Sequence, residues 1–159
     1  NSAFHGAALD RHHIASELRR FLSDVEESYN ITPEDLCRQG VYLSHETCTH
    51  ASPEASCAAN EVYALREAFG EHLQHLIILN TKGYTGHPMG VSFEDTVAVE
   101  CLLTGITPPM ANWKMEDENL GSLNLSTGGR ADRPLRYALR FAAGFGSQVA
   151  FALYGVFDG

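Results

Sequence analysis

The stretch LIILNTKGYTGHPMG, residues 76–90, holds the strongest indication of the fold. Its first four residues are apolar and two of them are β-branched, which is typical of a short strand buried on both faces. The residues that follow are rich in glycine and polar groups, and a long helix is predicted from about Pro88 to Leu103, stopped by Gly105. Because open α/β sheets bind ligands beyond the carboxyl ends of their strands, we expect a ligand site in this loop.

Further helices and strands are predicted on both sides of this stretch. Helical spacing of apolar residues predicts a helix over 10–29, and Thr32 followed by Pro33 predicts the start of a second helix, which breaks near Gly40. Further patterns predict a helix over 58–69 and strands over 41–43, 123–125, 135–142 and 148–154. Strands separated by helices favour a partly parallel sheet with helices packed on it, so we predict an α/β domain.

Composition excludes several classes of function. The 159 residues suit one compact domain, with residues 1–9 as a tag or disordered leader and 10–159 as the domain. A net charge of −9 disfavours nucleic acid as a partner, and no apolar run reaches the ~18 residues that cross a membrane. The four cysteines are expected to be reduced thiols, which indicates a cytoplasmic protein.

His87 and Lys82 are the residues best placed for chemistry. A histidine at the start of a helix tends to stay neutral, and a neutral imidazole can donate a hydrogen bond to a developing oxyanion. Lys82 would add positive charge nearby, unless it is simply solvated and His87 merely caps the helix. Glu94 and Asp95 are explained as acidic residues that favour the first turn of the same helix.

Two motifs resemble those of β-ketoacyl synthases. Residues 82–90 resemble the lysine–glycine–histidine motif that precedes a long helix in this family, and residues 143–148 are similar to its glycine–phenylalanine–glycine turn between the last two strands. The order and separation of the motifs, with Pro108 and Pro109 between them, also suit the family. The chain therefore resembles the C-terminal half of a β-ketoacyl synthase from a modular polyketide or fatty-acid synthase.

The resemblance implies a fold and a reaction. The fold would be the second thiolase-like half domain, with a mixed, mainly five-stranded sheet covered by helices. The reaction would be decarboxylative Claisen condensation, an acyl transfer in which no cofactor takes part beyond the phosphopantetheine of an acyl carrier protein. Expected partners are this carrier protein, the missing N-terminal half and a second copy in a homodimer.

The resemblance also assigns roles to single residues. His87 would be the second histidine, which donates to the enolate oxygen, and Lys82 would support it. Phe145 would be the gating phenylalanine, with its backbone amide in an oxyanion hole. The predicted substrate-binding residues are Thr85, Gly144, Phe145 and Gly146.

Two departures from the family pattern limit this assignment. Cys48 falls where the family has its first histidine, in a Glu-x-His-Gly-Thr-Gly-Thr-Pro stretch after a strand, and a thiol is a weak donor. His45 or His50 could reach the site instead. The nucleophilic cysteine belongs to the N-terminal half, so this chain alone is expected to be inactive.

Two alternatives remain open from the sequence. The Cys48 substitution favours a non-catalytic condensing-enzyme homologue that acts as a structural or chain-length-setting partner. The second alternative is a zinc site in the cluster His45, Cys48, His50 and Cys57. Its spacing matches no common zinc motif, so no metal is predicted.

Overall fold

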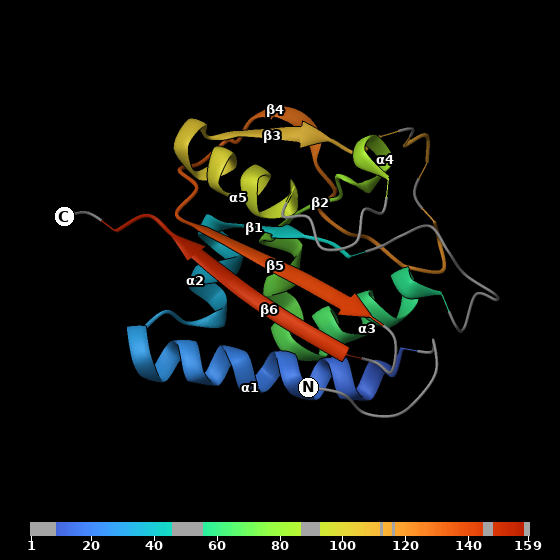
Figure 1. The fold of residues 1–159 in the computed structure, drawn as a ribbon, viewed down its shortest axis with the longest axis vertical. Coiled ribbons are helices and arrows are strands. Elements are labelled where there is room, and N and C mark those ends of the chain that lie inside the picture. The colour runs from blue at the N-terminus through green and yellow to red at the C-terminus, as the bar shows by residue number, and fades with distance from the viewer. Residues whose placement is uncertain are drawn as a thin grey trace.

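The computed structural model describes residues 9–45, 56–86, 93–111, 113–115, 117–144 and 148–157. Most of the predicted leader, residues 1–9, lies outside this part. The helices and strands in chain order are α1 (Arg11–Tyr29), α2 (Pro33–Gln39), β1 (Gly40–Leu43), α3 (Cys57–Phe69), the 3₁₀ helix η2 (Gly70–His75), β2 (Ile77–Leu79), α4 (Lys82–Thr85), α5 (Phe93–Thr104), β3 (Ile106–Pro109), β4 (Thr127–Arg130), β5 (Tyr137–Gly144) and β6 (Gln148–Gly155) (Figure 1).

The main sheet is mixed, as predicted. Its strand order is β2-β1-β5-β6, with β1 parallel to both β2 and β5, and β5 antiparallel to β6. The described residues give this sheet four strands, and the predicted strand over 123–125 contributes one parallel bridge, between Ile78 and Leu125, on the outer side of β2. A separate antiparallel ribbon is formed by β3 and β4.

The first two helices form where the sequence predicts, and a side chain caps the start of each. The Asp10 carboxylate accepts hydrogen bonds from the backbone N–H groups of His12 and His13 at the start of α1. Thr32 and Asp35 form a reciprocal capping box at the start of α2, with Pro33 in its first turn. Capping satisfies backbone donors that a helix leaves open, so both helices begin at fixed positions.

Helices cover the sheet on two faces (Figure 1). One face carries Tyr42, Ile78 and Leu139, which pack in a large apolar core with α1 and α3. The other face carries Val41 and Leu79, which pack in a smaller core with α5. Successive strand residues point to opposite faces, so three short strands supply both cores.

Helix α5 differs from the others in its exposed side. It buries Ala98 and Cys101 against the sheet, yet Phe93, Val99 and Leu103 are exposed, Leu103 to 73%. Thr96, Glu100 and Thr104 are exposed as well, so the outer side of α5 is a mixture of apolar and polar residues.

No helix in the described part of the chain combines the length and apolarity that a membrane span needs.

Candidate functional site

The carboxyl ends of β1 and β2 lie at one edge of the sheet. The backbone N–H of Ser44 donates to the carbonyl oxygen of Leu79 at 2.9 Å, and the side-chain nitrogen of Asn80 lies 3.5 Å from the hydroxyl of Ser44. The two loops that leave these strands therefore begin side by side, and both contain residues that the sequence singled out.

Lys82 begins a single helical turn, α4, where the sequence predicted only a loop. Its backbone N–H donates to the side-chain oxygen of Asn80 at 2.8 Å. Gly83 packs so closely on Ala111 that a Cβ at this position would lie 2.5 Å from the Ala111 Cβ, and the Tyr84 hydroxyl donates to the carbonyl oxygen of Pro109 at 2.8 Å. These contacts fix the turn against the segment that follows β3.

The side chain of Lys82 is buried and ion-paired. It is 8% exposed, and its ammonium donates to Oε1 of Glu94, whose side chain is 6% exposed. The alternative of a solvated lysine is therefore wrong.

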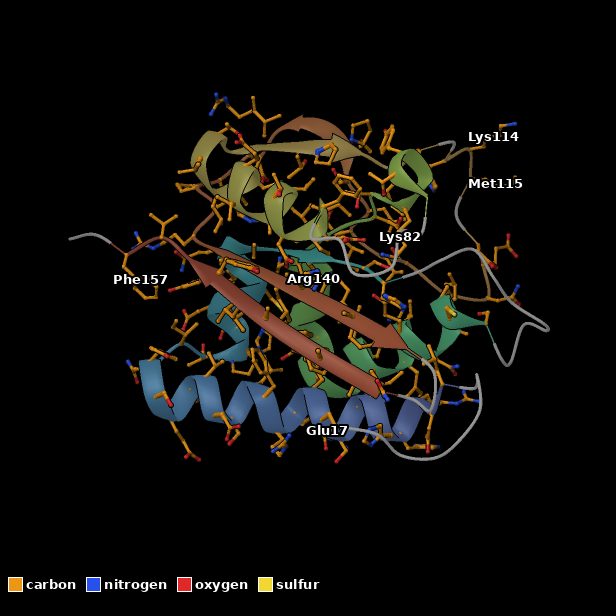
Figure 2. All side chains as sticks on the ribbon, viewed as in Figure 1. Glu17, Lys82, Lys114, Met115, Arg140 and Phe157 are labelled. Atoms are coloured by element: carbon orange, nitrogen blue, oxygen red, sulfur yellow. The ribbon has the colours of Figure 1, made fainter. Side chains whose placement is uncertain are left out.

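Glu94 and Asp95 do more than favour the start of α5, which corrects the expectation from the sequence. Nη2 of Arg140, on β5, lies 3.6 Å from Oε2 of Glu94, and Nε of Arg140 lies 3.1 Å from Oδ1 of Asp95. The Tyr154 hydroxyl, from β6, donates to the same Asp95 oxygen at 2.9 Å. Figure 2 labels Lys82 and Arg140, which reach this network from different elements. We call Lys82, Glu94, Asp95, Arg140 and Tyr154 the charged network.

The charged network sets the ionisation of Glu94. Burial alone would raise the pKa of its carboxyl, but hydrogen bonds from Lys82 and a backbone N–H, with the charges of Lys82 and Arg140, outweigh burial and lower the pKa. The Arg140 Nε contact with Asp95 is a close charge contact that lacks hydrogen-bond geometry, since this Nε has no hydrogen-bond partner. Glu94 is thus held as a carboxylate.

His45 follows the end of β1 and is buried. Its backbone N–H donates to Oε1 of Glu61 at 3.1 Å, and its ring stands edge-on to the Phe141 ring, with centroids 5.8 Å apart. Burial raises the pKa of the neighbouring Tyr42 hydroxyl, and the charge and hydrogen bond of Glu61 raise it further. His45 was predicted only as a possible substitute for Cys48, although a buried histidine at a strand's carboxyl end is a candidate for function.

The other predicted site residues fall into two groups, of which the first, Thr85 and Gly144, lies within the described residues. Thr85 ends α4, with its hydroxyl 3.3 Å from the carbonyl oxygen of Thr81, and Gly144 ends β5, whose carboxyl end points the same way as that of β1. The second group lies outside the described residues and consists of Cys48, His50, His87, Phe145 and Gly146.

An apolar cavity of about 200 Å³ lies on the α3 side of the sheet. Ser44 and Glu61 are among its polar walls, and the segment after β3 supplies Met110 and Trp113. Its lining suits an apolar group more than a charged one.

Cys37 and Cys101 are free, buried thiols. Burial raises the pKa of Cys37 to about 12 and that of Cys101 to about 11. Neither thiol has the accessible, ionised character of a nucleophile. Among the described residues no three histidine, cysteine or acidic side chains gather as a metal site needs, and the zinc alternative depends on Cys48 and His50, which lie outside them.

Comparison with known proteins identifies one group of relatives. No protein-family model matches the chain. Nodulation protein E of Rhizobium meliloti is 29% identical over 151 residues, which cover 93% of this chain and 34% of that protein. The chain thus spans about a third of the length of the curated relatives that it matches.

Solved structures extend the likeness to ketosynthases. A chain in the complex of a type II polyketide synthase acyl-carrier protein with its ketosynthase gives a TM-score of 0.77 at 19% identity, with 99% of this chain and 36% of that chain covered. The ishigamide ketosynthase/chain length factor gives 0.75 at 20% identity, with 97% and 35% covered. A β-ketoacyl synthase from Burkholderia phymatum gives 0.68 at 19% identity, with 96% and 36% covered.

At these identities the likeness shows the fold. The predicted resemblance is confirmed at that level, and the covered share is consistent with the predicted C-terminal half. The chain therefore has the α/β fold of the ketosynthases and corresponds to about a third of such a chain.

Proposed function

We propose that the chain is the C-terminal part of a β-ketoacyl-[acyl-carrier-protein] synthase, which condenses an acyl thioester with a malonyl group held on a carrier protein. One observation carries this proposal: the carboxyl edge shared by β1 and β2 bears a buried histidine, His45, and a buried, ion-paired lysine, Lys82. The ketosynthase fold over nearly the whole chain supports it.

The proposed reaction divides between this chain and the rest of the enzyme. A cysteine outside this chain carries the acyl group as a thioester. The malonyl group, on the phosphopantetheine arm of the carrier, loses carbon dioxide, and the resulting enolate attacks the thioester carbonyl while the cysteine thiolate leaves. His87 would donate to the enolate oxygen, Lys82 would support that donor, and the turn at Gly144–Gly146 would bind the acyl carbonyl.

His45, rather than Cys48, is our proposed first histidine. The family pattern places this histidine after a strand, followed by threonines two and four positions later. His45 follows β1, and Thr47 and Thr49 stand at those spacings. An imidazole can donate the hydrogen bond that the Cys48 thiol would make only weakly. This alignment places a histidine at the first-histidine position, while Leu43, Glu46, Cys48 and His50 then depart from the pattern at its Glu, its two glycines and its Pro.

The exposed apolar side of α5 supports a partner from the remainder of the enzyme. Val99 and Leu103 lie on this side, and about two thirds of the length of the matched ketosynthase chains has no counterpart in this chain. We propose that the N-terminal half covers α5, that an acyl carrier protein delivers the malonyl group, and that the complete enzyme works in the cytoplasm. The ketosynthase of the first structure above is itself bound to an acyl-carrier protein.

The test is malonyl-carrier decarboxylation by the full-length enzyme with single substitutions. We expect His45→Ala and His87→Ala each to lower the rate about a hundred- to thousandfold, because each removes an oxyanion donor. Cys48→Ala should stay within about threefold of the wild type, since it is assigned no donor role. Loss of activity in Cys48→Ala with none in His45→Ala would reverse the assignment.

A second candidate function is a non-catalytic, chain-length-setting partner of a ketosynthase. It is favoured by the likeness to the ishigamide ketosynthase/chain length factor. In that case the full-length protein alone would not decarboxylate, but adding it to an active ketosynthase would change product length. Wild-type decarboxylation that depends on His87 would exclude this candidate.

A further inference from the structure

The charged network extends beyond the predicted site to the two last strands. The Arg140 guanidinium lies between two carboxylates, with Nη2 3.6 Å from Glu94 Oε2 and Nε 3.1 Å from Asp95 Oδ1. The other oxygen of Glu94 faces Lys82. Lys82 and Arg140 therefore face different oxygens of the same Glu94 carboxylate.

We propose that Arg140 is a positioning residue, which holds the Glu94 carboxylate in the orientation that places the Lys82 ammonium in the condensing site. This inference rests on the proposed function. It adds a residue that lies in neither of the two motifs that resemble the family and at none of the predicted site positions.

Charge balance is the first argument. Glu94 and Asp95 are adjacent at the start of α5, and in the described part of the chain Lys82 and Arg140 are the cations that contact them. The strands β1 and β3, which also pack against α5, contain no charged residue, and β6 contributes the Tyr154 hydroxyl. Without Arg140, Asp95 would lose the cation that contacts it, beside a buried Glu94 carboxylate that keeps only Lys82.

Geometry is the second argument. A guanidinium is a rigid fork that can contact two carboxylates at once, whereas a lysine ammonium is a single point of charge. Arg140 pairs with Leu43 of β1 and lies four residues before Gly144, on the strand that leads into the proposed acyl-binding turn. Its side chain therefore connects that strand with the start of α5, where Glu94 pairs with Lys82.

The experiment measures malonyl-carrier decarboxylation by the full-length enzyme, and the stability of that enzyme as a function of pH. Arg140→Ala should lower kcat about tenfold and leave KM within about twofold, because the lysine is misplaced while substrate binding persists. In urea titrations of the same variant, the acid limb of the stability profile should move up toward pH 4.5, because the Arg140 charge is one of the causes that lower the pKa of Glu94. Arg140→Lys should restore part of the pH shift but little of kcat.

Arg130→Ala is the matched control. Arg130, the last residue of β4, donates to the carbonyl oxygen of Thr104 at 3.1 Å, at the opposite end of α5, so this variant removes an arginine that contacts the same helix without touching the charged network. It should keep the wild-type kcat and acid limb.

Two results would overturn the proposal: an Arg140→Ala variant with wild-type kcat and pH profile, or equal losses of kcat and melting temperature in both alanine variants. A wild-type enzyme without activity would reject the proposed function instead. The ¹⁵N signal of the Lys82 ammonium, assigned with Lys82→Arg, then provides the test. It should shift in Arg140→Ala and not in Arg130→Ala, and an unchanged signal in both would reject the role of Arg140.

Discussion

The two faces of the main sheet are covered in different ways. On one face, α1 turns its apolar residues inward and its charged residues to solvent, and with α3 it closes a large core. On the other face, α5 buries a smaller core and a charged network, and leaves apolar side chains such as Leu103 exposed. The helices on the first face expose mainly charged residues, while the helix on the second face also exposes apolar side chains.

Breaking the buried pair of the α5 face should have the largest effect. Glu94→Ala leaves the Lys82 ammonium buried without its partner, so we expect a loss of about 3–5 kcal/mol in the free energy of unfolding, measured by urea titration. The double variant Lys82→Met/Glu94→Leu should recover most of this loss, since neither charge is then buried. A double variant no more stable than Glu94→Ala would show that packing, not charge, is at fault.

Truncating a buried side chain of α1 should lower the free energy of unfolding somewhat less. Leu18 is fully buried in the α1–α3 core, and Leu18→Ala should lower the free energy of unfolding by about 3 kcal/mol, measured in the same way. Glu26→Ala, on the solvent side of α1, serves as control and should stay within about 0.5 kcal/mol. Similar losses in both variants would mean that α1 does not pack as described.

Low pH should lower the free energy of unfolding through Glu94 on the α5 face. This effect should be smaller than those of the two substitutions above. The pKa of Glu94 is lower in the fold than its ordinary value of 4.5, so its carboxylate stabilises the fold above that pH and the contribution is lost as pH falls further. The difference in unfolding free energy between wild type and Glu94→Gln should therefore shrink below pH 4.5. A difference that stays constant between pH 7 and pH 3 would contradict the lowered pKa.

The smallest effect is expected on the outer side of α5. Leu103→Ser should change the unfolding free energy of this chain by less than about 0.5 kcal/mol, because the side chain is largely exposed. In the full-length enzyme the same substitution should lower stability more, if the remaining part covers this side. A large loss of unfolding free energy in the isolated chain would show that other residues of this chain already cover Leu103.

Local patterns predicted the parts of the fold that depend on local physics. The capping residues Asp10 and Thr32 fixed the first two helices, and the apolar run at 76–79 became β2. The helical turn α4 and the strand β4 were not predicted. Gly128 and Gly129 of β4 have φ of 86° and 101°, and glycine gives no strand preference that a sequence pattern could show.

The candidate site was predictable only in part, because its main contacts join distant residues. Lys82 was chosen from a motif, but its pairing with Glu94 crosses twelve positions, and Arg140 comes from another strand. An acidic residue in the first turn of a helix is sufficiently explained by the helix dipole, so nothing in the sequence pointed to an ion pair of Glu94. His45 was not predicted as the first histidine because the family stretch was matched to this sequence with Cys48 at that position. The position of His45 after the strand predicted over 41–43, and its spacing to Thr47 and Thr49, were signals in the sequence that could have identified it.

The ionisation of the two buried thiols has a practical consequence for labelling. With a pKa of about 12, the Cys37 side chain would be about one part in ten thousand thiolate at pH 8, and Cys101, at about 11, roughly one part in a thousand. Electrophilic reagents react with the thiolate, and both sulfurs are also enclosed. An alkylating probe such as iodoacetamide should therefore leave these two cysteines unmodified in the folded enzyme, so that peptides containing them provide an internal standard for any residue that the probe does modify.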